Sequence, residues 1–225
     1  MQNYAFSKKK TSFGRFLAKK TVAVWVIQII IYIFALDLHN NIYTMEYIKT
    51  AIEGVYIIQP KVFEDARGYF FEAFKKEEFV KNIGKIDFIQ DNESKSSKGV
   101  LRGLHYQKGE FSQAKLVRVI KGSVLDVAVD LRKDSATFGQ HVMVELSEDN
   151  KRQFFIPRGF AHGFLVLSDE AIFTYKVDNV YAPAHEASIR FDDPQLGIEW
   201  PMDANEILTS KKDLEALPFA KAETF

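Results

Sequence analysis

The sequence predicts an all-β fold, a sandwich or a barrel, for most of its length. Short segments in which apolar and polar residues alternate follow one another from residue 50 onward, at the spacing of about 8–12 residues that is typical of such folds. Turn residues separate these segments, and only two short stretches have helical character. Strands that alternate with long helices, which would indicate a parallel sheet, are therefore not expected.

The individual elements follow from the positions of the turn residues. Turns are expected at residues 66–68, 98–99, 121–123, 148–150, 157–159 and 168–169. The expected strands are residues 55–58, 69–73, 88–91, 114–120, 124–131, 141–146, 153–156, 163–167 and 172–178. One helix is expected at residues 75–81, around a run of two lysines and two glutamates, and another at residues 211–216.

Two of these strands carry a charged residue within an apolar pattern. In the strand 124–131, Asp126 lies on the face opposite four aliphatic residues. In the strand 114–120, Lys115 shares its face with two valines. One interpretation is that Asp126 and Lys115 project into a polar cavity at one end of a barrel. Alternation alone instead predicts that Asp126 faces solvent.

The composition excludes several classes of protein. The chain has 225 residues, of which 47% are hydrophobic and 27% charged, with 20 phenylalanines, so it has enough apolar surface to fold and is not a disordered chain. It has no cysteine, which excludes a disulfide scaffold, a cysteine-ligated metal site and a thiol nucleophile. The formal net charge is zero, so there is no general attraction to nucleic acid.

The first 44 residues differ from the rest. Residues 1–44 have six basic residues and one acidic residue, and they contain an apolar run at 22–36. This run is shorter than the roughly 20 residues of a spanning helix, and no small-residue cleavage site follows it. A membrane anchor, an uncleaved signal and upstream sequence translated from a start codon placed too early are the alternatives. We favour Met45 as the true start, with a single domain at 45–225, so membrane association is not expected.

The histidines are the only candidates for strong nitrogen ligands. The chain has five of them: His39, His105, His141, His162 and His185. The pattern Pro-x-Gly-x-x-His that ends at His162 resembles the second motif of the cupin superfamily, whose members are small jelly-roll barrels. A metal-binding cupin also has His-x-His in its first motif, whereas His105 is followed by Tyr106 and Gln107. Two histidines without a third ligand make a poor divalent site, so no metal is expected. An imidazole with a pKa near about 6.5 suits acid–base work instead.

A series of local motifs resembles one family. The motifs are VFEDARGYFFE (62–72), FIQDN (88–92), LRGLHYQ (101–107), QAKLVRV (113–119), DVAVDLR (126–132), FIPRGFAHGF (155–164), YKVDNVY (175–181) and SKKD (210–213). Together, from about residue 48 to 217, they resemble the dTDP-4-dehydrorhamnose 3,5-epimerases. The resemblance implies a cupin-like jelly roll that acts in the cytoplasm and needs no cofactor.

The resemblance also implies a set of catalytic residues. The family replaces the protons at C3 and C5 of a nucleotide-linked 4-keto-6-deoxy sugar, which requires a base, an acid and a positive group for the enolate oxygen. By similarity, His105 is the base, Asp213 orients it, and Lys115 stabilises the oxyanion. Asp126 is expected to pair with Lys115 or to hold the histidine region in place. Tyr175 is the acid, although its own strand pattern indicates ordinary packing.

The remaining matches are to residues that bind the substrate, a dTDP-linked sugar. They are Arg67, Glu72, Gln90, Asn92, Arg102, His162, Tyr181, Glu186 and Lys212. Arginine suits a pyrophosphate because its planar fork donates hydrogen bonds in pairs. In the family, Arg67 and Glu72 belong to a strand that crosses to the neighbouring subunit, which implies a homodimer with shared sites. From the local sequence alone, Arg67 would be interpreted as a turn residue and Lys212 as a solvent-exposed residue at the end of a helix.

Other functions remain open at this point. They are a 3-only or 5-only epimerase, a 3,4-ketoisomerase, a cupin that binds a sugar nucleotide without catalysis, and a metal-dependent cupin oxygenase. The presence of both His105 and Tyr175 favours double epimerisation. The missing second histidine argues against the oxygenase. The motifs do not separate thymidine from uridine nucleotides, because a stacking surface accepts either base.

Overall fold

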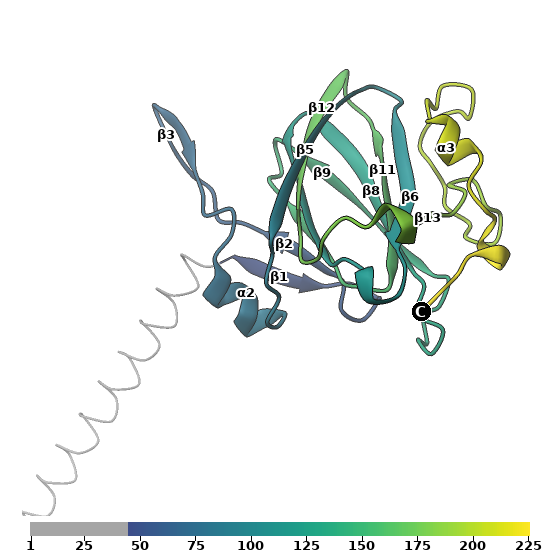
Figure 1. Ribbon diagram of the computed structural model, residues 1–225. Helices are drawn as coiled ribbons and strands as arrows, with labels where there is room; N and C mark the ends of the chain where they lie inside the picture. The colour runs from purple at the N-terminus through teal and green to yellow at the C-terminus, as the bar shows by residue number, and fades with distance from the viewer. Residues whose placement is uncertain (1–44) are drawn as a thin grey trace, which may run out of the picture. The chain divides into compact units, whose positions relative to one another are not determined.

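Residues 45–225, the part of the chain that the computed structural model describes, contain two antiparallel β-sheets. The strands of the first sheet, in spatial order, are β1 (Glu46–Lys49), β2 (Tyr56–Gln59), β10 (Gln153–Ile156), β7 (Lys115–Lys121), β12 (Glu170–Val177) and β5 (Gln90–Ser97). Those of the second sheet are β13 (Glu186–Ser188), β6 (Leu101–Gln107), β11 (Phe160–Val166), β8 (Ser123–Asp130) and β9 (His141–Ser147). The sheets face each other, and most strands that are adjacent in space are distant in sequence (Figure 1). The prediction of an all-β, cupin-like jelly roll is confirmed.

A hairpin and several short helices complete the fold. The hairpin pairs β3 (Phe63–Asp65) with β4 (Gly68–Phe70) and stands away from the two sheets (Figure 1). The helical elements are α2 (Lys76–Asn82), α3 (Lys211–Leu214) and the 3-10 turns η1 (Gly109–Phe111), η2 (Pro183–His185) and η3 (Phe219–Lys221). The predictions for residues 1–44 lie outside the described residues.

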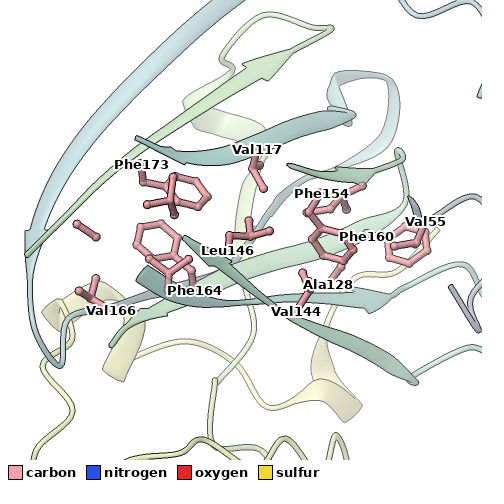
Figure 2. Close-up of a cluster of buried hydrophobic side chains, with 14 of the residues drawn as sticks. Val55, Val117, Ala128, Val144, Leu146, Phe154, Phe160, Phe164, Val166 and Phe173 are labelled. Atoms are coloured by element: carbon pink, nitrogen blue, oxygen red, sulfur yellow. The ribbon is translucent and has the colours of Figure 1, made fainter. Parts of the chain in front are cut away.

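The main core lies between the two sheets. Because successive side chains of a strand point to opposite faces, alternate residues of each strand enter this space. Val117 and Phe173 from the first sheet gather there with Ala128 and Phe164 from the second (Figure 2). The rings of Phe164 and Phe173 stack with their centroids 4.2 Å apart. Burial of each phenylalanine side chain stabilises the folded state by about 1.5–3 kcal/mol. These contacts therefore hold the two sheets together face to face.

The outer face of the second sheet is covered as well, and this changes the surroundings of Asp126. On β8, Val127 and Val129 are buried in a second apolar cluster with C-terminal residues that include Phe225. The other face of β8 carries Asp126 and Ala128 and points into the space between the sheets. Asp126 is 0% exposed. The expectation that Asp126 faces solvent is therefore wrong, because the aliphatic face of its strand packs on a layer outside the sandwich.

An irregularity in the pairing of β6 with β11 places Arg102 and His105 of β6 on the same side of the sheet. His162 pairs with His105, and the next pair is Phe164 with Arg102. Two residues of β6 therefore face the single residue Gly163, which is the geometry of a β-bulge. Gly163 allows this close approach, because a Cβ there would lie 2.7 Å from the carbonyl oxygen of Arg102. Regular alternation would send Arg102 and His105, three residues apart, to opposite faces.

Every expected strand overlaps an observed strand, but β1, β3, β6 and β13 have no counterpart among the expected strands. The most consequential of these is β6, which is buried on both faces along most of its length and so lacks alternation. β5 extends beyond the expected segment 88–91 because its sequence is almost wholly polar and carries no apolar signal. The two helices occupy the expected places, although α3 ends earlier, at Leu214.

Candidate active site

A cavity of about 440 Å³ opens between the two sheets. Strands β5, β6, β7, β11 and β12 border it, together with the segment that leads into α3. Its volume lies within the usual range for small-molecule sites. The residues predicted from the sequence that line it are Arg102, His105, Lys115, His162, Tyr175 and Asp213.

His105 and Asp213 form a hydrogen-bonded pair across 108 positions of the sequence. The His105 Nε2 atom lies 2.5 Å from Asp213 Oδ1, and Asp213 is only 3% exposed. Burial opposes ionisation of Asp213, but the hydrogen bond and charge of His105 outweigh it, so the pKa of this carboxyl lies below its usual value. An ionised Asp213 accepts the Nε2–H, which leaves Nδ1 as the basic nitrogen of the imidazole.

The position of Asp213 is set by the start of α3. Ser210 is the N-cap of this helix, and its Oγ accepts the backbone N–H of Asp213 at 3.2 Å. The Ser210 hydroxyl also helps to hold the pKa of Asp213 low. The pattern Ser-x-x-Asp is a recognisable helix-start signal, so the sequence contains a mark of this supporting residue.

Lys115 and His162 in the cavity wall form a second group with Asp126, which is buried behind them. His162 Nε2 lies 2.9 and 3.1 Å from the two carboxylate oxygens of Asp126, and its Nδ1 lies 3.5 Å from Lys115 Nζ. The hydrogen-bond partner of Asp126 in this group is thus His162. Burial raises the pKa of Asp126 and lowers that of His162. A neutral His162 that donates from Nε2 presents Nδ1 to the lysine as an acceptor.

The pKa of the Lys115 amino group is lower than that of an ordinary lysine. Burial lowers its pKa to about 8, against the opposing charges of Asp126 and Glu186. At neutral pH it is therefore still mainly an ammonium, and in a low-dielectric site it stabilises a negative oxygen more than it would in water.

Tyr175 faces the cavity from the sheet opposite His105. It lies on β12 between the core residues Phe173 and Val177, and its ring centroid is 6.0 Å from Lys115 Nζ. Burial raises its pKa, partly offset by the charge of Arg102. The phenol is therefore protonated at neutral pH and can donate a proton. Tyr175 packs against the core, as its strand pattern indicates, and it also lines the cavity.

Arg102 enters the cavity with its guanidinium oriented by a serine. Its Nε donates to Ser96 Oγ at 3.0 Å, and Ser96 on β5 is 8% exposed. This contact uses the Nε–H and leaves the two terminal nitrogens for a ligand, the geometry that suits an anion with paired oxygens. Ser96 is not among the residues predicted from the sequence, since a serine in a polar strand gives no distinctive signal.

Three of the predicted binding residues form a group of polar contacts with one another. The Tyr181 hydroxyl donates to Glu186 Oε2 at 2.9 Å, and Lys212 Nζ lies 2.7 Å from the same oxygen. Despite burial, these contacts lower the pKa of Glu186. Tyr181 as a residue is 58% exposed, so its aromatic side chain is open to solvent.

The other predicted binding residues lie outside the main cavity. Gln90 Nε2 donates to Asn92 Oδ1 at 2.7 Å, and Asn92 borders an adjoining cavity of about 370 Å³ that shares Tyr175 with the first. Arg67 lies in the hairpin, 90% exposed and paired with Asp65. Glu72 follows the hairpin and lies 3.5 Å from Lys75. Within residues 45–225 the cavity lining contains neither Arg67 nor Glu72.

Between residues 45 and 225, no three histidine, aspartate or glutamate side chains converge in a way that would hold a metal ion. The helices in that range are all too short or too polar to cross a bilayer.

Comparison with known proteins gives a consistent match. A family model described as dTDP-4-dehydrorhamnose 3,5-epimerase matches residues 49–221. The chain is 56% identical over 165 residues to the dTDP-4-dehydrorhamnose 3,5-epimerase of Salmonella typhimurium, an alignment that covers 73% of this chain and 90% of that protein.

Solved structures agree with the sequence match. The dTDP-4-dehydrorhamnose 3,5-epimerase of Elizabethkingia anophelis aligns with a TM-score of 0.76 at 51% identity and covers 78% of this chain and 97% of its own. A dTDP-6-deoxy-D-glucose-3,5-epimerase of Legionella pneumophila, solved in complex with dTDP-4-keto-L-rhamnose, aligns with a TM-score of 0.77 at 49% identity. That alignment covers 80% of this chain and 95% of the Legionella protein.

Proposed function

This chain belongs to the dTDP-4-dehydrorhamnose 3,5-epimerase family, and from that premise we propose that its cavity converts dTDP-4-dehydro-6-deoxy-D-glucose to dTDP-4-dehydro-L-rhamnose. The reaction inverts C3 and C5 of the sugar on the way to dTDP-L-rhamnose. One arrangement carries the proposal: the His105–Asp213 pair and the Tyr175 hydroxyl come from facing sheets, with Lys115 beside them. No cofactor is part of it.

Each inversion begins with loss of a proton from a carbon next to the C4 ketone. His105 Nδ1 takes the proton, and the electron pair of the C–H bond moves into the carbonyl to form an enolate. The Lys115 ammonium stabilises the enolate oxygen. Asp213 holds the imidazole in the reactive tautomer and stabilises the imidazolium that results.

Each inversion ends when a proton arrives on the opposite face of the same carbon. Tyr175 donates its phenolic proton as the enolate electrons return to form the new C–H bond and restore the ketone. The chain then holds an imidazolium and a phenolate, which are reset when His105 releases its proton to solvent and Tyr175 regains one. A second round at the other carbon completes the double epimerisation.

The nucleotide end of the substrate is assigned to the cations and the open aromatic surface near the cavity. The guanidinium of Arg102, oriented by Ser96, suits the pyrophosphate. The exposed Tyr181 side chain suits stacking on the base. Glu186, which is paired with Lys212, accepts the Tyr181 hydroxyl and holds it in place.

The pH dependence follows from the acidity of Lys115. An amine is charged below its pKa, and the value of about 8 means that the stabilising ammonium is lost as the pH rises through about 8. We expect kcat/KM to fall over that range. The Lys115→Arg variant keeps its charge to much higher pH, so its weaker activity is expected to show no such decline. A wild-type profile that stays flat to pH 10 would contradict the assignment.

The experiment that tests the function is deuterium incorporation. The protein is incubated in heavy water with dTDP-4-dehydro-6-deoxy-D-glucose and without any reductase, and C3 and C5 are followed by NMR. Label at both carbons, with formation of the L-rhamno product, is the expected result. The enolate mechanism requires it, because each new C–H bond takes its proton from a group that exchanges with solvent.

The same spectra separate the alternatives. Label at one carbon only indicates a 3-only or 5-only epimerase. Label at C3 together with movement of the keto group indicates a 3,4-ketoisomerase. Complete absence of label from a folded protein that binds dTDP indicates a cupin that binds the sugar nucleotide without catalysis, and the catalytic roles would then be withdrawn.

We also propose that the chain works as a homodimer in which the hairpin completes the partner's site. Two features support this: Arg67 is 90% exposed on a hairpin that stands away from the two sheets, and Tyr69 and Phe70 on the same hairpin are 55% and 67% exposed. Apolar surface of this kind is typical of an interface.

A complementation experiment tests the shared site. Arg67→Ala and His105→Asn are each expected to be inactive as separate proteins. Refolding the two together is expected to restore activity, because a mixed dimer contains one site with both native residues. A monomeric mass by light scattering, or a refolded mixture with no activity, would contradict the shared site.

Residues 45–225 are proposed to carry the activity in the cytoplasm without residues 1–44. All candidate residues lie in this range, as does the match to the family model. Removal of residues 1–44 is expected to leave kcat/KM unchanged, measured beside the full chain. Loss of activity on truncation, or recovery of the full chain with the membrane fraction, would contradict this.

A further inference from the structure

The side chain of Gln107 contacts the main chain on both sides of Tyr181. Gln107 is the last residue of β6 and is 5% exposed. Its Nε2 donates to the carbonyl oxygen of Val180 at 3.0 Å, and its Oε1 accepts the backbone N–H of Ala182 at 2.7 Å. The second Nε2 hydrogen goes to the carbonyl oxygen of Phe111 at 2.8 Å. The amide therefore binds the two peptide groups that flank Tyr181 and ties them to β6.

The same residue lies opposite the group that holds the Tyr181 hydroxyl. In the pairing of β13 with β6, Glu186 is the register partner of Gln107, and Glu186 accepts the Tyr181 hydroxyl. The main chain of Tyr181 is thus fixed by Gln107 and the far end of its ring by Glu186. With both anchors in place Tyr181 is still 58% exposed, so its ring is oriented without being covered.

The loop that carries Tyr181 has further anchors, mainly at its two ends. Gln113 Nε2 donates to the carbonyl oxygen of Asn179 at 2.7 Å and makes a longer contact, 3.3 Å, with that of Val180, which Gln107 also binds. The backbone N–H of Lys108 donates to the carbonyl oxygen of His185 at 2.9 Å. These contacts hold the two ends of the loop. The Gln107 amide acts at its centre, where the aromatic side chain is attached.

We propose that Gln107 is a positioning residue that presents the Tyr181 ring to the base of the nucleotide, a role that rests on the proposed function. A ring held in its binding orientation loses little conformational entropy when a ligand stacks on it. When the two flanking peptides are released, the loop samples other conformations, and the apparent affinity falls in proportion to the fraction that remains competent. Because His105 and Tyr175 act on the sugar and not on the base, the chemical steps are unaffected once the substrate is bound.

The test is the Gln107→Met variant, which keeps the volume of the side chain and removes the three hydrogen bonds. We expect both KM and the dissociation constant for dTDP, measured by calorimetry, to rise by about tenfold, with kcat nearly unchanged. Gln59→Met is the matched control, since Gln59 also contacts a loop through both amide atoms, at Asn150 and Arg152, away from the cavity. It is expected to leave both constants as in the wild type.

A double-mutant cycle with Tyr181→Ala separates positioning from a general effect on folding. If Gln107 acts through the ring, Gln107→Met adds no further loss of dTDP affinity in the Tyr181→Ala background. Additive losses would overturn the proposal, as would a fall in kcat at unchanged KM, which would indicate a role in the strand of His105. Unchanged KM and dTDP affinity in the folded variant would overturn it too.

If Gln107→Met does not fold, the Gln107→Glu variant tests the positioning role of Gln107 in its place. The carboxyl keeps an acceptor for Ala182 but faces the carbonyl oxygens of Val180 and Phe111 with at most one donor. A rise in KM is therefore again expected, and wild-type KM and dTDP affinity would overturn the proposal. The wild type measured in parallel keeps the two hypotheses apart. A wild type that binds dTDP without turnover refutes the proposed function, whereas a defect or its absence in the variants concerns Gln107 alone.

Discussion

The His105→Asn variant is expected to lose turnover by about 10²–10⁴-fold, the usual contribution of a positioned general base. Asparagine is similar in size and retains an amide that can reach Asp213, but it cannot accept a proton at neutral pH. Deuterium exchange is therefore expected to stop at C3 and at C5 together, since one base serves both carbons. The measurement is the NMR exchange assay, with dTDP affinity and circular dichroism to establish that the variant is folded and binds nucleotide.

Asp213→Asn is the informative companion to this variant. It leaves His105 in place but removes the charge that favours the imidazolium, so a smaller loss of rate is expected than for His105→Asn. Exchange at either carbon at the wild-type rate in His105→Asn would refute the base assignment. If His105→Asn lost deuterium exchange at only one of the two carbons, a second base would have to act at the other carbon.

The Tyr175→Phe variant is expected to separate proton removal from proton delivery. Phenylalanine keeps the ring that packs beside Phe173 and removes the hydroxyl that donates. Formation of the L-rhamno product is expected to fall by about 10²–10⁴-fold, while His105 continues to remove protons and return them to the same face. Deuterium is then incorporated into unchanged substrate, which NMR distinguishes from product.

Tyr106→Phe serves as its control. Tyr106 is also largely buried, but its hydroxyl donates to the carbonyl oxygen of Glu223 in the C-terminal layer, away from the residues that line the cavity. Both exchange and product formation are expected to proceed in this variant. Product formed at the wild-type rate by Tyr175→Phe would remove Tyr175 from the mechanism, and loss of exchange together with turnover would show that the hydroxyl is needed for the first step.

Local patterns in the sequence predict the strands that have one apolar and one polar face. They miss a strand such as β6, which is buried on both faces. β7 and β12 have turn residues at their ends and apolar residues at alternate positions, and both are observed near their expected positions. β6 has apolar residues on both faces, so its pattern has no period of two to detect. The strand that carries His105 and Arg102 is therefore found only in the fold, although the motif around His105 marks its chemical importance.

The side on which a charged residue lies also depends on packing that a strand pattern does not contain. Asp126 lies opposite a row of aliphatic residues, and a two-layer sandwich would place it in water. The C-terminal residues form a third layer on that aliphatic face, so Asp126 faces inward and binds His162. The layer comes from residues far along the chain, and no local pattern predicts where they pack.

The sequence by itself determines the class of fold and the set of reactive groups: two histidines in recognisable motifs, a lysine, a tyrosine and two carboxylates, without any thiol. It also determines the helix start at Ser210 that supports Asp213. Which of these groups meet is decided by the tertiary structure. The bulge opposite Gly163 directs Arg102 and His105 to one side, and the facing of the sheets sets Tyr175 across the cavity from His105. These outcomes depend on pairing between distant strands, and a shift of one residue in register reverses every side chain.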